Sequence, residues 1–569
     1  MTNAALPVIL FTNRALGKEA THLSKANKKQ TFLGGAAVLA LATAIVKVIG
    51  AFYKIPIKSV IGADGYGYFN SAYDIYNVLL MIATTGLPVA MSRMISEANA
   101  LHNYPQIRRI YDVSKRVFVL IGIVGTVGMA ALCIPLADLV GQRNAWFPIL
   151  CLSPAVLLIC FSSVNRGFFQ GQGDMRPTSI SQVLEALCKL IVGLGCAVGI
   201  MWFFRKNGLD TQTPSEALAG AHSWAAGGAI IGVTLGCGLA ALYLFSRVRR
   251  TDVYRAREGG EVRSVSDTAK ALLKIAIPIT IGSAGLQLIN LADTAVYMWR
   301  LKDAAGFSQA DADTIKGIYN FCQTIFNLPC AFVTPIVVAA IPALTEKITT
   351  KDRRGKTAIM ESAMRVMALI AAPCAIGLLA LAGPIYHLLS SGADAAEVLT
   401  AQPLLAILGV CVIFNCIVLV TNGIMQSHGD VTIPVIHMLI GGGIKLVVSF
   451  LLVGIPEVNL IGAAVSTLVC YTVISALNLF AMSRRGYPVN VLRTMLKPLL
   501  AALIMGAAAF GSYRLFFVLG LSGLVSTGGA ILAAGMVYII FVLLLRVITR
   551  DDCNLLPKGD KIAKILKIR

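Results

Sequence analysis

The sequence is poor in charge and especially poor in acids: 14% of its 569 residues are charged, and 28 Asp and Glu stand against 49 Lys and Arg. A soluble chain of this length needs far more polar surface to cover its core. The hydrophobic content of 57% and the mean hydropathy of +0.76 come from apolar runs of about 20 residues, the length that spans a bilayer. These runs are continuous and lack two-residue alternation, which excludes a transmembrane β-barrel. The chain is therefore predicted to be an all-α polytopic membrane protein.

Paired cysteines and clustered histidines are also missing. The 13 cysteines are scattered, mostly within apolar runs, no CxxC pair occurs, and the six histidines are dispersed. This pattern predicts buried, unpaired cysteines and no metal site. The net charge of +21 is spread over the loops, so nucleic-acid binding is not expected. A membrane-embedded transferase would need clustered acids or histidines inside the membrane, so we expect no enzymatic activity.

Apolar runs separated by charged breaks predict fourteen membrane spans. Alternate loops are rich in Lys and Arg: segments 247–274 and 483–497 are basic, whereas segment 390–398 holds only Asp394 and Glu397. Because basic loops mark the cytoplasmic side, both termini are predicted to be cytoplasmic. The spans lie near residues 33–60, 68–97, 115–138, 146–168, 178–203, 223–246, 271–299, 315–345, 362–389, 399–425, 431–453, 458–482, 496–517 and 523–547.

Two stretches recur along the chain. QGQGDMRP (170–177) matches MQSHGDVTIP (425–434) after a shift of 256 residues, and GYFNSAYDIYN (67–77) matches GIYNFCQTIFN (317–327) after a shift of 250. Each half then holds six spans, so both halves enter the membrane from the same side. Transporters built from such parallel repeats place their substrate site between the halves, which predicts two pseudo-symmetric six-helix lobes around a transport site.

The predicted organisation follows from this repeat. A basic tail precedes the first lobe, a basic linker leads to the second lobe, and a helix pair and a second basic tail end the chain. The boundaries are 1–32 for the N-terminal tail, 33–247 for the N-lobe (helices 1–6), 248–270 for the linker, 271–484 for the C-lobe (helices 7–12), 485–548 for helices 13–14 and 549–569 for the C-terminal tail.

Lysines occur deep inside the predicted spans. Lys189 and Lys445 match each other in the repeat and lie about 20 Å into their helices. A charge at the bilayer centre costs about 2.5–3.5 kcal/mol, and substrate binding would explain why it is kept. Glu185 lies four residues before Lys189, so the two residues either serve a substrate or form a helical ion pair that neutralises itself. Lys445 lacks such a partner because Gly441 stands at the matching position.

Four further charges complete the candidate set. Lys47 and Lys54 lie seven residues apart and share one face of the first span, and Arg93 and Arg166 lie near the cytoplasmic ends of the second and fourth spans. These side chains either line a cavity or extend to the lipid head groups. A surplus of interior cations predicts an anionic substrate group, and the point charge of lysine suits phosphate. The predicted substrate-binding residues are Lys47, Lys54, Arg93, Arg166, Glu185, Lys189 and Lys445.

Acids within the membrane are few, Asp74 and Asp293 being the notable ones. Asp293, with Asn290 one turn away, is predicted to bind a coupling ion, Na⁺ or H⁺, because oxygen ligands suit a hard cation. The alternative role for Asp293 is that of a counter-charge to a nearby lysine. No cofactor beyond this ion is expected.

Several motifs together resemble one family. They are VKVIGAFYKIPIKSVIGADGYGYFNSAYDIY (46–76), GLPVAMSRMISE (86–97), NRGFFQGQGDMRPT (165–178) and LLPKGDKI (555–562). Their combination is similar to the Gram-positive branch of the lipid II and polysaccharide flippases, which includes MurJ-like and stage V sporulation protein B-like members. These flippases belong to the multidrug/oligosaccharidyl-lipid/polysaccharide exporter superfamily. The resemblance extends from residue 33 to about residue 565.

The resemblance implies a fourteen-helix fold, alternating access and export of an undecaprenyl-pyrophosphate-linked precursor such as lipid II for peptidoglycan biosynthesis. It implies a location in the bacterial cytoplasmic membrane, a lipid-linked oligosaccharide as substrate, and anionic membrane lipids and the cell-wall synthesis machinery as partners. One departure concerns helices two and eight, where Gram-negative MurJ-type proteins carry arginines and this chain has Asp74 and Thr324. Either the cations have moved to Lys189 and Lys445 or the substrate is held differently. An ion-coupled multidrug antiporter of the same fold is the alternative function.

Overall fold

The computed structural model describes residues 6–208, 215–251, 261–390 and 393–548, and within these ranges the regular structure is entirely helical. The helices are α1 (Leu6–Thr84), α2 (Gly86–Ala100), α3 (Tyr104–Ala131), α4 (Cys133–Leu139), η1 (Arg143–Ala145), α5 (Trp146–Gly171), α6 (Arg176–Cys188), the π-helical η2 (Lys189–Gly193), α7 (Leu194–Lys206), α8 (Ser215–Arg249), α10 (Val265–Asp303), α11 (Gln309–Thr349), α12 (Arg353–Ala380), α13 (Ala382–Leu389), α14 (Ala395–Ser427), α15 (Thr432–Val453), α16 (Ile461–Arg484), α17 (Val491–Val518) and α18 (Gly523–Leu544). The predicted C-terminal tail, 549–569, lies outside the described residues.

A glycine separates the first two predicted spans. Gly62 interrupts α1 with φ 75° and ψ 178°, a conformation that residues with a Cβ atom avoid. The rings of Tyr53 and Phe69 lie 6.0 Å apart, so the two arms of α1 fold back against each other around this glycine. The break agrees with the predicted separation of spans 33–60 and 68–97.

Eleven segments among the described residues are long and apolar enough to cross a membrane. One of them, Ile45–Ala100, contains both arms of α1 together with α2, whereas α10 and α11 are not among the eleven. The predicted all-α, polytopic architecture is therefore confirmed. The number fourteen stays a prediction.

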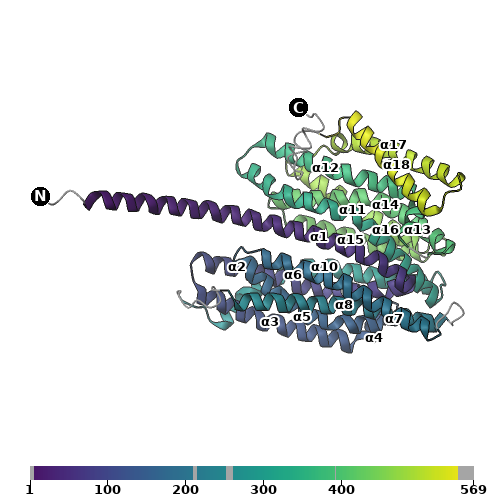
Figure 1. The fold of residues 1–569 in the computed structure, drawn as a ribbon, viewed down its shortest axis with the longest axis horizontal. Helices are drawn as coiled ribbons and strands as arrows, with labels where there is room; N and C mark the ends of the chain where they lie inside the picture. The colour runs from purple at the N-terminus through teal and green to yellow at the C-terminus, as the bar shows by residue number, and fades with distance from the viewer. Residues whose placement is uncertain (1–5, 209–214, 252–260, 391–392, 549–569) are drawn as a thin grey trace.

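Helix α1 runs between two groups of helices (Figure 1). It packs against α5 of the group that contains α2, α3, α5, α6 and α8, and against α11 of the group that contains α11, α12 and α14 to α18. Helix α10 packs against α2 and α15 and so also contacts both groups. One hydrophobic cluster, which includes the buried rings of Tyr53, Phe69, Tyr319 and Phe321, extends across this boundary. The two groups thus meet along α1, α10 and α11.

The repeat found in the sequence has a structural counterpart in two turns. Gly173 and Gly429 both adopt positive φ, 81° and 88°. The backbone N–H of Asp174 donates to Phe169 at 3.0 Å, and that of Asp430 donates to Met425 at 2.9 Å, again 256 residues apart. Only a glycine enters this left-handed turn without strain, which explains the Gly-Asp pair in both copies.

Side-chain caps fix where the two central helices begin. Ser264 accepts a hydrogen bond from the backbone N–H of Asp267 at the start of α10, and Ser308 accepts one from Asp311 at the start of α11. In both cases the Asp lies in the first turn, where its charge is favourable to the helix dipole. These caps set the register with which α10 and α11 present their polar residues to the interior.

Candidate functional site

A polar cavity of about 480 Å³ lies where α1, α10, α11, α15 and α16 meet. Asn77 and Asn327, which match each other in the repeat, both line it. Polar side chains inside membrane helices are costly unless they bind one another, water or a substrate. Their concentration here therefore indicates a functional site. The polar lining residues are Asp74, Asn77, Gln287, Asn290, Asp293, Thr294, Asn320, Gln323, Asn327, Lys445 and Thr467.

A buried ion pair crosses this cavity. The Nζ of Lys445 on α15 lies 2.8 Å from Oδ2 of Asp293 on α10, and their side chains are 12% and 3% exposed. Lys445 therefore has a partner, contrary to the expectation from its own helix, because α10 supplies the acid that Gly441 cannot. The second carboxylate oxygen, Oδ1 of Asp293, is buried without a hydrogen-bond partner among the described residues. Asn290 lines the cavity one turn away and is exposed.

Asp74 is a second acid at the cavity. The hydroxyl of Thr294 donates to its Oδ2 at 3.3 Å, which joins α1 to α10. Asp74 also interacts electrostatically with Lys316, Lys54 and Lys445. One carboxylate therefore lies among three lysines from three helices, and a substrate anion would meet a field that Asp74 only partly neutralises.

Lys189 lies between two aromatic rings. Its Nζ donates to the hydroxyl of Tyr73 at 2.8 Å and lies 4.9 and 4.8 Å from the ring centroids of Tyr53 and Tyr73. Lys54 and Glu185 both lie close enough to interact with it electrostatically. Aromatic faces stabilise an ammonium group without pairing it with a full opposite charge, so the contact with the two rings is compatible with anion binding by Lys189.

The helix widens at this residue. Lys189 begins the π-helical segment η2, and π-helical turns occur frequently at functional sites. On the same turn Gly193 approaches α8 so closely that a Cβ on Gly232 would lie 2.2 Å from its nitrogen. The close packing of these two glycines holds the widened turn in place.

Glu185 pairs with Arg166 instead of Lys189. The Nη2 of Arg166 on α5 lies 3.0 Å from Oε2 of Glu185 on α6, and the Nε of Arg166 donates to Ser181 at 3.1 Å. The helical pair between Glu185 and Lys189, one of the two readings of the sequence, is not the contact that forms. Arg166 and Glu185 thus link α5 to α6.

Two predicted residues lie at the periphery. Lys47 is exposed and donates to the hydroxyl of Thr334 on α11 at 2.8 Å. Arg93 is exposed and forms a 3.4 Å ion pair with Glu97 one turn along its own helix. Neither residue lines the cavity, and of the seven predicted substrate-binding residues only Lys445 does.

The end of the molecule that carries Gly62 is closed by contacts that the sequence reading did not include. Lys58, which is buried, pairs with Glu397 at the start of α14. The hydroxyl of Tyr68 donates to Asp313 at 3.2 Å. A Cβ on Gly317 would lie 1.6 Å from the carbonyl oxygen of Ala63, so α1 and α11 touch backbone to backbone.

Lys316 was also missed, because it falls at the very start of the predicted span 315–345. It is fully buried on α11 and donates to Ser71 on α1. Its position next to the repeated segment 317–327 was the signal that placed it inside the membrane. No group of three His, Cys, Asp or Glu that could hold a metal ion occurs among the described residues.

The cavity lining itself carries two acids, Asp74 and Asp293, and one cation, Lys445. Lys54 and Lys316 interact electrostatically with Asp74 from outside the lining, so these five side chains together have one positive charge in excess. Such an arrangement attracts an anion into a site that pairs only part of its own charge.

Comparison with known proteins identifies the family. The family model described as polysaccharide biosynthesis protein matches residues 32–347, more than half of the chain. The chain belongs to this family. A second family model, MatE, matches residues 315–451.

Two curated relatives come from Bacillus subtilis (strain 168). Lipid II flippase MurJ is 27% identical over 492 residues, which cover 84% of this chain and 87% of the relative. Stage V sporulation protein B is 22% identical over 533 residues, which cover 93% and 98%. A solved structure of the lipid II flippase MurJ in an inward closed conformation has a TM-score of 0.64 at 14% identity and covers 89% of this chain and 98% of that one. The resemblance found in the sequence is confirmed: this is a membrane transporter of the multidrug/oligosaccharidyl-lipid/polysaccharide exporter superfamily.

Proposed function

We propose that this transporter moves an undecaprenyl-pyrophosphate-linked cell-wall precursor such as lipid II across the bacterial cytoplasmic membrane. The observation that carries the proposal is the group of lysines at the cavity, with Lys445 in its lining and Lys54 and Lys316 acting on the lining acid Asp74. A pyrophosphate carries at least two negative charges and needs several cations to replace its hydration in the membrane. The similarity to lipid II flippase MurJ supports the same substrate class.

The route follows from the positions of the lysines. Lys189 and Lys54 lie on the side of the first helix group, and Lys445 lies on the side of the second. A pyrophosphate between the groups would be bound from both sides while its polyprenyl chain stays in lipid. Binding of the pyrophosphate would draw the two helix groups together. Their separation at the Gly62 end would then release it, which is the alternating-access cycle.

The proposed topology has fourteen spans with both termini in the cytoplasm and the domain boundaries given above. In this topology the Gly62 end faces outward. The contacts of Lys58 with Glu397, Tyr68 with Asp313 and Gly317 with Ala63 then form the closed outer gate. Substrate from the cytoplasmic leaflet would meet a cavity already sealed against the outside.

Asp293 is proposed to bind the coupling ion, Na⁺ or H⁺, with Asn290. Oδ2 of Asp293 pairs with Lys445, while Oδ1 is buried without a partner in the described part of the chain. A pyrophosphate that takes Lys445 would leave the carboxylate unpaired, and a cation would then restore its balance. The substrate would therefore bind Lys445 and the coupling ion would bind Asp293, the two members of one ion pair.

An ion-coupled multidrug antiporter is the second candidate, favoured by the MatE match over residues 315–451. Export of organic cations would need acids that no lysine balances, whereas Asp293 is paired with Lys445 and Asp74 interacts with Lys54 and Lys316. The cell-wall synthesis machinery remains a proposed partner, since handing over an exported precursor would require it.

Depletion of the protein in its host tests the proposal. The lipid-linked intermediate that accumulates in the inner leaflet should carry a pyrophosphate, and a plasmid copy of the wild-type gene should clear it. A Lys445→Gln/Asp293→Asn copy, in which the pair is neutral, should leave it in place. Unchanged lipid intermediates together with raised sensitivity to organic cations would favour the antiporter instead.

A further inference from the structure

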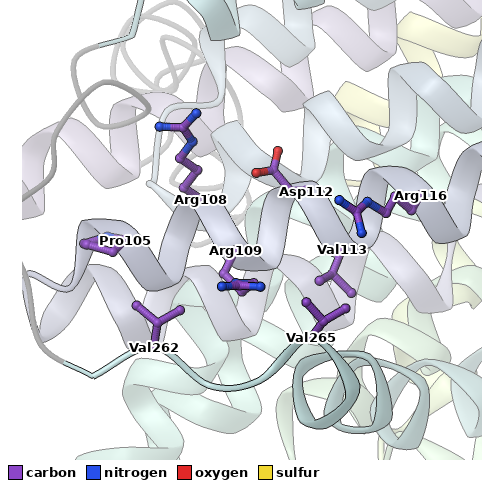
Figure 2. Close-up of a pocket in the computed structure, with 8 residues that line it drawn as sticks. All are labelled: Pro105, Arg108, Arg109, Asp112, Val113, Arg116, Val262 and Val265. Atoms are coloured by element: carbon purple, nitrogen blue, oxygen red, sulfur yellow. The ribbon is translucent and has the colours of Figure 1, made fainter.

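A second, separate pocket lies on the surface at the end of the molecule opposite Gly62. It has a volume of about 450 Å³ and lies between the first half of α3 and the segment that leads into α10. Figure 2 shows Arg109 between α3 and the strip of chain that carries Val262 and Val265. Its other lining residues are Pro105, Arg108, Asp112, Val113 and Arg116. The central cavity, in contrast, is lined from α1, α10, α11, α15 and α16.

The pocket has a fixed wall. The side chain of Asn103 donates to the carbonyl of Glu261 at 2.9 Å. The backbone N–H of Arg263 donates to Oε1 of Gln106, also at 2.9 Å. These two bonds attach the segment before α10 to the start of α3, so the cleft between them is part of the fold.

The pocket is suited to an anion. Arg109 and Arg116 provide two guanidinium groups against the single carboxylate of Asp112, and Arg108 lines the same pocket. Guanidinium groups bind phosphate oxygens with two parallel hydrogen bonds each. Arg109 is half-buried, which lowers the screening of its charge by water.

The position of the pocket identifies the kind of anion. Arg109 and Arg116 lie on the same face of α3 as Leu120 and Val127, since steps of seven, four and seven residues return to one side of a helix. Leu120 and Val127 are 64% and 60% exposed, as side chains that face lipid are. Leu120 lies only about 6 Å beyond Arg116 along the helix. The arginines therefore stand where the hydrocarbon ends and the head groups begin.

We propose that this pocket binds the phosphate head group of an anionic phospholipid, with the acyl chains along the Leu120–Val127 face of α3. In the proposed topology this lipid belongs to the cytoplasmic leaflet. Val262 and Val265 are exposed beside the arginines and cover the glycerol region of the bound lipid. The lipid would tie the segment before α10 to α3 and so join the start of the second half of the chain to the first.

The test uses the full-length protein purified in mild detergent. Bound phospholipid is counted by native mass spectrometry, and the melting temperature is followed during titration with phosphatidylglycerol, phosphatidylcholine or inorganic phosphate. Arg109→Gln/Arg116→Gln should weaken phosphatidylglycerol binding about tenfold, the loss expected for removing charged hydrogen bonds. The matched control is Arg353→Gln/Arg354→Gln, which removes two exposed arginines at the start of α12 and should bind as the wild type does.

A second variant keeps the charge. Arg109→Lys/Arg116→Lys should retain part of the affinity, because lysine offers the charge without the paired hydrogen bonds. Gel filtration shows whether each variant is folded. If the glutamine variant is not folded, the lysine variant is used for the test. Phosphatidylglycerol retention equal to that of the wild type in the folded arginine variants would overturn the proposal. So would equal stabilisation by phosphatidylcholine, or by inorganic phosphate, which would assign the pocket to a soluble anion.

Discussion

The ammonium group of Lys445 lies 2.8 Å from the carboxylate of Asp293 and thereby joins α15 to α10 inside the central cavity. Both side chains are largely removed from solvent, so each stabilises the other against the cost of burying a charge. Lys445 is one of the two lysines matched by the repeat, and among the described residues it is the one that forms an ion pair in the cavity lining. Variants that remove one or both charges of this pair therefore test stability and transport separately.

Removal of one partner should destabilise the protein. Lys445→Ala leaves Asp293 buried and unpaired, which costs about 3–5 kcal/mol. Lys445→Met/Asp293→Leu, which removes both charges and keeps the volume, should recover most of this loss. Thermal unfolding in detergent measures both variants. A Lys445→Ala protein as stable as the wild type would mean that Asp293 is already neutral or solvated.

Lys189 should matter for transport more than for folding. Lys189→Met preserves the packing between Tyr53 and Tyr73 but removes the charge, so transport should fall at least about tenfold, while stability should fall no more than in Tyr73→Phe, which loses the same hydrogen bond. Tyr73→Phe removes only the 2.8 Å hydrogen bond and should cost about 0.5–1.5 kcal/mol of stability. Full transport by Lys189→Met would exclude Lys189 from the substrate path.

The Gly62 end should open when its closest contact is obstructed. In Gly317→Ala the new methyl group would meet the carbonyl of Ala63, and such overpacking costs about 1–3 kcal/mol. In a background without native cysteines, a cysteine at Thr324 should then react faster with a water-soluble thiol reagent. Gly443→Ala, where no atom lies within 4 Å of the new methyl, is the control. Equal rates in the two variants would show that this contact does not hold the end closed.

Cysteines on the first arm of α1 should differ in their reaction with a water-soluble thiol reagent, according to whether they face the cavity or the packed interior. A cysteine at position 54 should react with the same reagent and become protected when a pyrophosphate-linked lipid is added, because Lys54 interacts with Asp74 at the cavity. A cysteine at Ala42, which is 6% exposed, should stay unreactive. Reaction at 54 that ignores the added lipid would count against a role of Lys54 in binding.

Much of the fold followed from the sequence because apolar run length and turn residues are local properties. The Gly-Asp turns at 173–174 and 429–430 were evident from the repeat, and both have the same backbone geometry. The all-α membrane class and the break between the first two arms were predicted for the same reason. The ends of the helices were less well predicted, since α10 and α11 continue beyond the apolar runs through their serine caps.

The partners of the charges were not predictable, because helical periodicity gives the face of a side chain but not the helix that it meets. The ion pair considered for Glu185 was with Lys189 on its own helix, but Glu185 contacts Arg166, and Lys445 contacts an acid on α10. Lys58 and Lys316 were overlooked because both lie near predicted loops, where charge needs no partner. These contacts depend on how separate helices approach one another.

The most direct test of the proposed function is transport by the purified protein in lipid vesicles. The movement of a labelled polyprenyl-pyrophosphate sugar lipid between leaflets is compared for the wild type and Lys445→Met/Asp293→Leu, the variant expected to be stable. The wild type should move this lipid, the variant should be slower by at least about tenfold, and neither should accumulate an organic cation. Movement of the lipid at the same rate by both proteins, or uptake of the cation by the wild type alone, would contradict the account.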